Sequence, residues 1–142
     1  MAYDRLLMLD DEAKKFTAKA AGTISGGFLV KWNSGTDSVG SDSSTYAWND
    51  IAVSACDSTN NVVGIALQTA TSGQAVAIAQ TGVFILPAGS AAISGGFPIT
   101  SAGYGNMAVA WDPASSGLTS VIGRAFTEAT ALTGFAIVRL DL

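Results

Sequence analysis

The sequence contains no histidine, one cysteine and few charged residues. It has 142 residues, 13% of them charged, and a formal net charge of −4. Without histidine the chain lacks the usual general base near neutral pH and the commonest neutral metal ligand, which removes Ser-His and Cys-His relays. The single thiol, Cys56, excludes an intrachain disulfide and a cysteine-rich zinc site. We therefore expect no catalytic residue, no cofactor and no bound metal.

Charge is concentrated near the N-terminus and is missing from a long central stretch. Eight charged side chains lie between residues 4 and 19, and none occurs from Ser58 to Trp111. The acidic balance argues against a basic face for nucleic acid. The longest strongly apolar runs have five or six residues, whereas a membrane-spanning helix needs about 20. We expect neither nucleic acid nor a membrane as a partner.

Short apolar stretches alternate with Gly, Ser, Asn and Pro, a pattern typical of strands and turns. Only residues 88–93, after Pro87, have the pattern of a short helical turn. The sequence therefore predicts a mainly β fold, a small barrel-like or sandwich domain of short strands with at most one short helix. The predicted strands are 28–32, 51–53, 62–67, 74–80, 83–86, 107–111, 120–126 and 134–140.

The N-terminal segment differs from the rest and predicts an arm, residues 1–20, on a single β domain, residues 21–142. That domain carries a polar loop at about 33–58, rich in Ser, Thr, Asp and Gly. The apolar run 6–9 is followed by the acids 10–12, which suit the cap of a short helix. The stretch after them also alternates like a strand, so both readings stay open. The apolar run either packs on the domain's own core or docks on a partner.

The strands are rich in alanine and bury little area per residue, since burial is worth roughly 25 cal/mol per Å². Segments 62–71 and 121–130 match at an offset of 59, a weak internal repeat. Further burial between subunits would stabilise so lean a core, which is a first indication of an oligomer. The larger side chains are the expected anchors of this core: Trp32, Trp48, Trp111, Phe84, Phe97, Phe126 and Phe135.

Three features have the pattern of a binding site, and each has a plainer interpretation. Residues 103–108 match a dinucleotide fingerprint, but the next stretch predicts a strand, so a hairpin turn is favoured. Asp37, Asp42 and Asp50 lack the alternate spacing of a calcium loop and are better explained as solvated carboxylates. Tyrosines and tryptophans can form a glycan platform, although core or interface use is favoured.

Residues 62–142 resemble the small capsid decoration, or cement, proteins of tailed bacteriophages and related viruses. The resemblance lies in the order and spacing of Gly, Ala and Val over about 80 residues rather than in one motif. The segments that carry it are 63–66, 73–78, 81–84, 87–88, 93–96, 121–125 and 136–140, with Gly105.

The resemblance implies a structural protein that binds the outer surface of a viral capsid as a homotrimer and bridges its subunits. The implied partner is the major capsid protein, and the implied location is the virion surface. An alternative is a viral or cell-surface adhesion module that binds glycan. An Asp- or Lys-based enzyme is disfavoured. By position, the implied capsid contacts of the arm are Tyr3, Leu6, Leu7, Met8, Leu9 and Phe16.

Overall fold

The computed structural model describes residues 14–33, 51–57, 62–103, 105, 107–114 and 120–142. Within these residues the protein is mainly β, as predicted. The strands are β1 (Lys15–Ala20), β2 (Leu29–Trp32), β3 (Ala52–Ala55), β4 (Val62–Ala66), β5 (Ala75–Ala79), β6 (Thr81–Pro87), β7 (Pro98–Ser101), β8 (Ala108–Ala110), β9 (Gly123–Ala125) and β10 (Phe135–Asp141).

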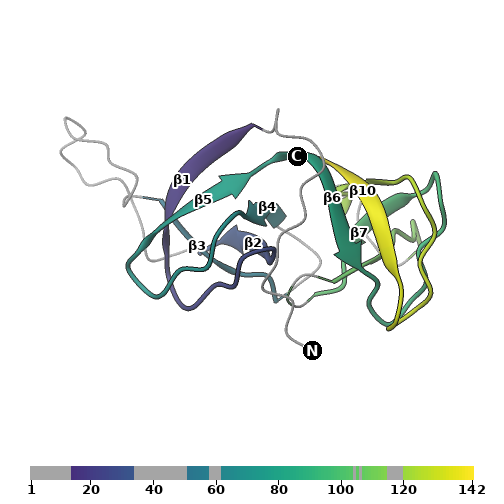
Figure 1. Cartoon of the computed structure of the whole chain (residues 1–142), viewed down its shortest axis with the longest axis horizontal. Helices are drawn as coiled ribbons and strands as arrows, with labels where there is room; N and C mark the ends of the chain where they lie inside the picture. Colours follow the sequence, from purple (N-terminus) through teal and green to yellow (C-terminus); the bar gives the residue numbers. More distant parts are fainter. Residues whose placement is uncertain (1–13, 34–50, 58–61, 104, 106, 115–119) are drawn as a thin grey trace.

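The first five strands form a closed barrel in the order β1-β3-β2-β4-β5, drawn on the left of Figure 1. Strands β1 and β3 pair in parallel, and β1 closes the ring by pairing antiparallel with β5. Small and β-branched side chains fill the interior, among them Ala18, Ile24, Val30, Val76 and Ile78. Such side chains suit a narrow barrel, because neighbouring strands approach closely around its axis.

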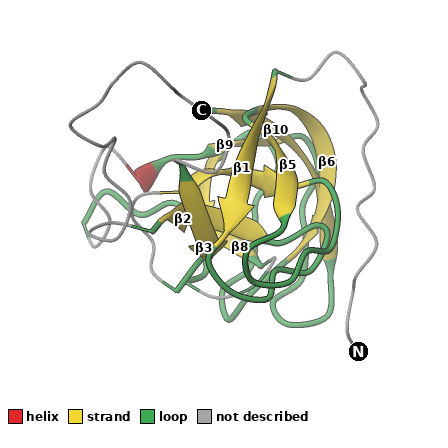
Figure 2. Ribbon diagram, turned by 90° about the vertical axis from the view of Figure 1, so that its left-hand side faces the viewer, coloured by secondary structure: helices red, strands yellow, loops and turns green. Residues whose placement is uncertain are grey.

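The last five strands form a second sheet in the order β6-β10-β9-β7-β8, drawn on the right of Figure 1. Its two outer strands approach each other, because Ala88 and Ala108 form a parallel bridge and Gly89 N donates to Ala108 O at 2.8 Å. The sheet is therefore strongly curled. Figure 2 shows its long strands β6 and β10 curving side by side around the outside of the molecule.

The barrel and the second sheet have the same strand pairing. Strands β6 to β10 correspond in order to β1 to β5, since each antiparallel pair of the barrel has its counterpart in the sheet. The loop before the second strand and the loop after the fourth strand are also joined in the same way in each copy. Ile24 exchanges two backbone hydrogen bonds with Ala70 at 2.9 Å, and Ile93 does the same with Ala129 at 2.9–3.0 Å. The fold is therefore two copies of one five-stranded unit.

The predicted repeat at 62–71 and 121–130 coincides with β4 and β9 and the loops after them, so it has a structural basis. The offset grows to 60 in the next strand, because Leu67 N donates to Ala77 O whereas Phe126 N donates to Ile137 O. A stronger signal escaped the sequence analysis. The pentapeptide Ile-Ser-Gly-Gly-Phe occurs at 24–28 and again at 93–97, before β2 and β7.

Both copies keep a glycine at the same place in the fourth strand. A Cβ on Gly64 would collide with the carbonyl oxygen of Ala79, and a Cβ on Gly123 with that of Arg139. These are equivalent contacts between the fourth strand and the fifth. The close approach of the two backbones therefore requires glycine in each copy.

One apolar core joins the two units. The side chains that fill the curled sheet, including Phe84 and Leu86, form a single cluster with Leu29, Ile65 and Ala79 from the barrel. The last three are not inside the barrel, where Val30, Ala66 and Ile78 point. The outer surface of the barrel thus closes the open side of the second sheet, while Gln80 alone separates β5 from β6.

The expectation that large aromatic side chains anchor the core is wrong for most of them. Phe84 is fully buried, but Trp32, Phe126 and Phe135 are about half exposed and Phe97 is 61% exposed. Trp111 is half-buried, and Trp48 lies outside the described residues. Ile, Leu and Val fill most of the interior instead, because closely spaced strands leave little room for rings.

The other sequence-based expectations divide into agreements and corrections. The eight predicted strands are confirmed, with bounds that differ by one to three residues, but β7 was missed. Residues 88–93 are not a helical turn: Ala88 and Ile93 form β-bridges. Residues 15–20, placed in the arm, form β1, and β3 lies within the stretch predicted as a polar loop. The division into residues 1–20 and 21–142 stays a prediction.

Substitution of either strand glycine should destabilise the fold. We expect Gly64→Ala and Gly123→Ala each to lower the free energy of unfolding by about 1–3 kcal/mol or more, because the added methyl group forces two backbones apart. Urea unfolding measures this. Gly22→Ala is the matched control, since a Cβ there meets nothing within 4 Å. An effect at Gly22 as large as at Gly64 would contradict the steric explanation.

Candidate functional site

A shallow hollow lies on the outside of the second sheet, where β9 and β10 run side by side. Its volume is about 280 Å³. Two arginines stand directly opposite each other in it, because Arg124 on β9 is the register partner of Arg139 on β10. The residues that line the hollow are Pro98, Val121, Gly123, Arg124, Phe126, Arg139 and Asp141.

The hollow corresponds to the part of the barrel that is covered within the molecule. By strand pairing, Arg124 and Arg139 occupy the places of Ile65 and Ala79, which are fully buried under the second sheet. Pro98 likewise takes the place of Leu29. The same surface of the unit is therefore an intramolecular interface in the first copy and open in the second.

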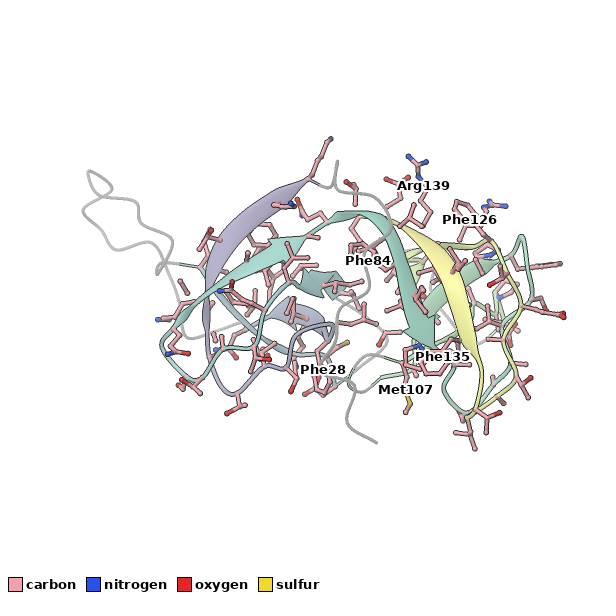
Figure 3. The ribbon with its side chains drawn as sticks, in the orientation of Figure 1. Phe28, Phe84, Met107, Phe126, Phe135 and Arg139 are labelled. Carbon is pink, nitrogen blue, oxygen red and sulfur yellow. The ribbon has the colours of Figure 1, made fainter. Side chains whose placement is uncertain are left out.

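Next to the hollow, the outward side chains of β6 and β10 form an apolar strip: Val83, Ile85, Phe135 and Ile137. Ile85 is the register partner of Ile137, and Val83 is that of Arg139, so the strip continues directly from the arginines. β6 alternates up to Leu86, with Phe84 and Leu86 buried and Val83 and Ile85 partly exposed, and β10 alternates along its whole length. Figure 3 shows Arg139 and Phe126 at one end of β10 and Phe135 toward the other.

At the matching positions on the barrel, the side chains are polar or small. Thr17 and Ala77 occupy the places of Ile85 and Ile137, and Lys15 that of Val83. Two copies of one fold thus present opposite chemistry on the same face. A contiguous set of exposed apolar side chains is typical of an interaction site, because such side chains are not needed to keep a protein in solution. The strip on the second copy therefore has the composition of a contact surface.

The two arginines are the only cationic side chains after Lys31. Arg124 donates a hydrogen bond to the carbonyl oxygen of Gly96 at 3.1 Å, which restrains its guanidinium group. Among the residues that the structure describes, neither arginine forms an ion pair with a carboxylate. Paired guanidinium groups above apolar side chains suit a carboxylate-bearing peptide, since arginine holds carboxylates in a bidentate geometry.

The barrel carries an ion pair away from the hollow. Lys31 Nζ is 2.6 Å from the carboxylate of Asp57. The hydrogen bond from Lys31 holds the pKa of Asp57 below its ordinary value of 3.8, although desolvation acts in the opposite direction. This pair is exposed, so it contributes little to stability.

The structure places the other sequence-based candidates as follows. Tyr3, Leu6, Leu7, Met8 and Leu9 lie outside the described residues, and so do Tyr46, Tyr104 and the three acids of the predicted calcium alternative. Phe16 lies in β1, half-buried, with its ring centroid 5.6 Å from that of Trp32. It therefore packs on the barrel.

The remaining motifs have structural explanations. Gly103 and Met107 lie between β7 and β8, which pair antiparallel, so the fingerprint-like segment is a hairpin connection. Cys56 is buried, with Sγ 3.3 Å from Ser101 Oγ across the two units. No group of three or more metal-ligating side chains occurs in the described part of the chain. No helix among the described residues has the length and apolar character needed to cross a membrane.

Comparisons with known proteins identify a family and a similar fold. A family model described as "Phage cement protein" matches residues 41–140. The N base of head fiber gp8.5 in bacteriophage phi29 has a similar solved structure, with a TM-score of 0.58 and 19% sequence identity; the match covers 90% of this chain and 93% of that one. At this identity the likeness shows the fold alone. No curated protein matches.

Stability should be nearly independent of pH between about 5.5 and 7.5. Histidine is absent, and the depressed pKa of Asp57 means that its stabilising contribution is complete above the unfolded-state value, about 3.9, and is lost only as the pH falls through the lower folded-state value. Thermal melting at several pH values tests this. A midpoint that moves by more than several degrees within that window would reveal a second perturbed carboxyl group.

The apolar strip should contribute little to folding, in contrast to the core beneath it. We expect the double variant Ile85→Thr/Ile137→Ala, which installs the barrel's own residues, to change the free energy of unfolding by about 1 kcal/mol or less. Phe84→Ala, on the inward side of β6, should cost about 3–5 kcal/mol. Urea unfolding compares the two. Equal losses would mean that the strip is part of the core.

Proposed function

The chain belongs to the phage cement protein family, whose members are structural proteins associated with phage capsids, and we propose that it binds the outer surface of a capsid as a homotrimer and bridges neighbouring subunits. Its partner in this proposal is the major capsid protein, and it performs no catalysis. The family match over residues 41–140 carries the proposal. The open hollow and apolar strip of the second unit support it, because they offer a surface suited to contact.

A decoration protein needs contact area rather than chemistry. A stable protein interface buries about 1,200–2,000 Å². A trimer gains further strength from avidity, because three linked sites must release together. Large exposed apolar side chains suited to such contacts include Phe97, Phe126 and Leu132 on the second unit, while Trp32 and Ile51 are exposed on the barrel. The matched face of the barrel, which carries charged and small side chains, would remain exposed to solvent.

The arm supplies the second part of the proposed contact. Tyr3 and the apolar run Leu6 to Leu9 combine an aromatic ring with four flexible apolar side chains. Phe16 lies in β1 beside Trp32, so it would act from the point where the arm joins the barrel. Capsid contact is proposed for Tyr3, Leu6, Leu7, Met8, Leu9 and Phe16.

Cosedimentation with expanded, undecorated capsids tests the proposal. The full chain should pellet with capsids to saturation and should raise the temperature at which the shells open. Deletion of residues 2–12 should weaken binding at least tenfold, because it removes the arm from all three subunits. Lys15→Gln/Lys19→Gln, on the barrel's matched face, should bind like the native chain.

Light scattering of the bound and released protein measures the oligomer. A mass three times that of one chain is expected on the capsid. Saturable binding to a glycan array without affinity for capsids would contradict the proposal and favour the adhesion alternative. Unchanged capsid binding after deletion of residues 2–12 would contradict the role of the arm.

A further inference from the structure

We propose that the open edge of β6 binds an extended, acid-bearing segment of the capsid partner as an additional strand of the second sheet. Main-chain hydrogen bonds supply the affinity of such a contact, and neighbouring side chains supply its specificity. The inference rests on the proposed function and names the part of this chain that receives the partner. The residues involved are Val83 and Ile85 at the edge, with Arg124 and Arg139 beside them.

Strand β6 lies at one end of the second sheet. In the order β6-β10-β9-β7-β8 its register partners, over Thr81–Pro87, all belong to β10. On its other side, contact with β8 begins only after β6 ends, where Ala88 and Ala108 form a parallel bridge. Within the described part of the chain, the edge of β6 therefore has no neighbouring strand along its length.

The backbone groups of Val83 and Ile85 face this open edge. Ile137, the register partner of Ile85, accepts a hydrogen bond from Phe126 N at 2.7 Å, on the side of β9. In an antiparallel pair, a residue that points away from its partner strand lies opposite one that also points away. Val83 is two residues along, so its backbone faces the same way as that of Ile85. The N–H and C=O groups of both residues therefore point toward the position of a further strand.

The matching edge of the barrel is also open, but its side chains deter pairing. Contact between β1 and β3 begins at Lys19. Before it come Lys15 and Thr17, which replace the two apolar residues of β6. Natural sheets protect open edges from other chains with charged residues, lysine above all. Val83 and Ile85 give no such protection and favour extended backbone, so the edge of the second copy is the one suited to accept a strand.

A proline extends the open edge of the second copy. In the barrel, Lys19 N donates to the carbonyl oxygen of Ile51 at 2.7 Å. Pro87 occupies the matching place in β6 and has no N–H to donate. The hydrogen bond to β8 comes two residues later, from Gly89 N to Ala108 O at 2.8 Å. The edge of β6 is therefore open for longer than that of β1, and it tolerates proline at an edge-facing position.

The charge beside the edge selects an acidic segment. Arg139 is the register partner of Val83, and Arg124 is that of Arg139, so two guanidinium groups lie next to the edge on the outward face. A strand added to β6 lies about 4.8 Å from it, which leaves a carboxylate beside Val83 within reach of the long side chain of Arg139. We expect the segment to place an acid beside Val83 and an apolar residue beside Ile85.

Proline substitution at the edge tests the inference in cosedimentation with expanded, undecorated capsids. Ile85→Pro removes an edge-facing N–H and spares the hydrogen bonds between β6 and β10, so it should weaken binding about tenfold or more. Ile85→Val keeps that N–H and should lose about threefold at most. Thr17→Pro, the same change on the edge of the barrel, should bind like the native chain. Equal losses in Ile85→Pro and Ile85→Val, or no loss in Ile85→Pro, would overturn the proposal.

The two arginines test the acidic character of the segment. Arg124→Gln/Arg139→Gln should weaken capsid binding about fivefold or more at low salt and should remove most of its salt dependence. Lys15→Gln/Lys19→Gln is the matched control on the barrel. Native affinity and salt dependence in the arginine variant would contradict an acidic segment.

Hydrogen exchange of the native chain tests the edge without any substitution. On capsids, mass spectrometry should show amide exchange slowed about tenfold or more at Val83 and Ile85, and unchanged at Lys15 and Thr17. Capsid binding without this protection would overturn the inference and leave the proposed function standing. Protection that rises with concentration in the free protein would assign the edge to a second copy and overturn it as well. Failure of the native chain to bind capsids would overturn both proposals.

Discussion

The apolar contact between the outside of the barrel and the inside of the curled sheet is the interaction on which the rest of the molecule depends. Leu29 and Ile65 of the barrel join Phe84 and Leu86 in one buried cluster, and with only Gln80 between β5 and β6 the two units are held together. This contact explains how a chain of short, alanine-rich strands gains a sizeable core in which Phe84 is the fully buried aromatic side chain among the described residues. It also determines which surfaces remain open.

Two copies of one unit provide an internal comparison that a single domain lacks. Where the barrel has Ile65 and Ala79 under the sheet, the second copy has Arg124 and Arg139 in an open hollow. Where the barrel has Thr17 facing outward, the second copy has Ile85. The strand pairing is equivalent in the two copies, so these differences lie in the side chains and not in the topology.

Much of the fold could be predicted from the sequence, because alternation and turn residues are local signals. Strand β7 was missed since Pro98 begins it and polar residues end it, and the duplicated pentapeptide before β2 and β7 was not matched. The burial of the aromatic residues could not be predicted. Phe84 and Phe126 both lie in predicted strands, and only the packing of the barrel on the sheet decides which one is inside. The hollow was missed because the register of β9 and β10, which brings Arg124 and Arg139 together across the sheet, is not a local signal.

The central claim is that the second copy, and not the first, carries the contact surface. A cryo-electron microscopy map of the decorated capsid, at a resolution that shows side chains, tests it most directly. The account predicts that Arg124, Arg139 and Ile137 are covered in the assembly, while Lys15 and Thr17 on the matched face of the barrel remain in solvent. A map in which the barrel's face is covered and the hollow of the second unit is open would contradict the account.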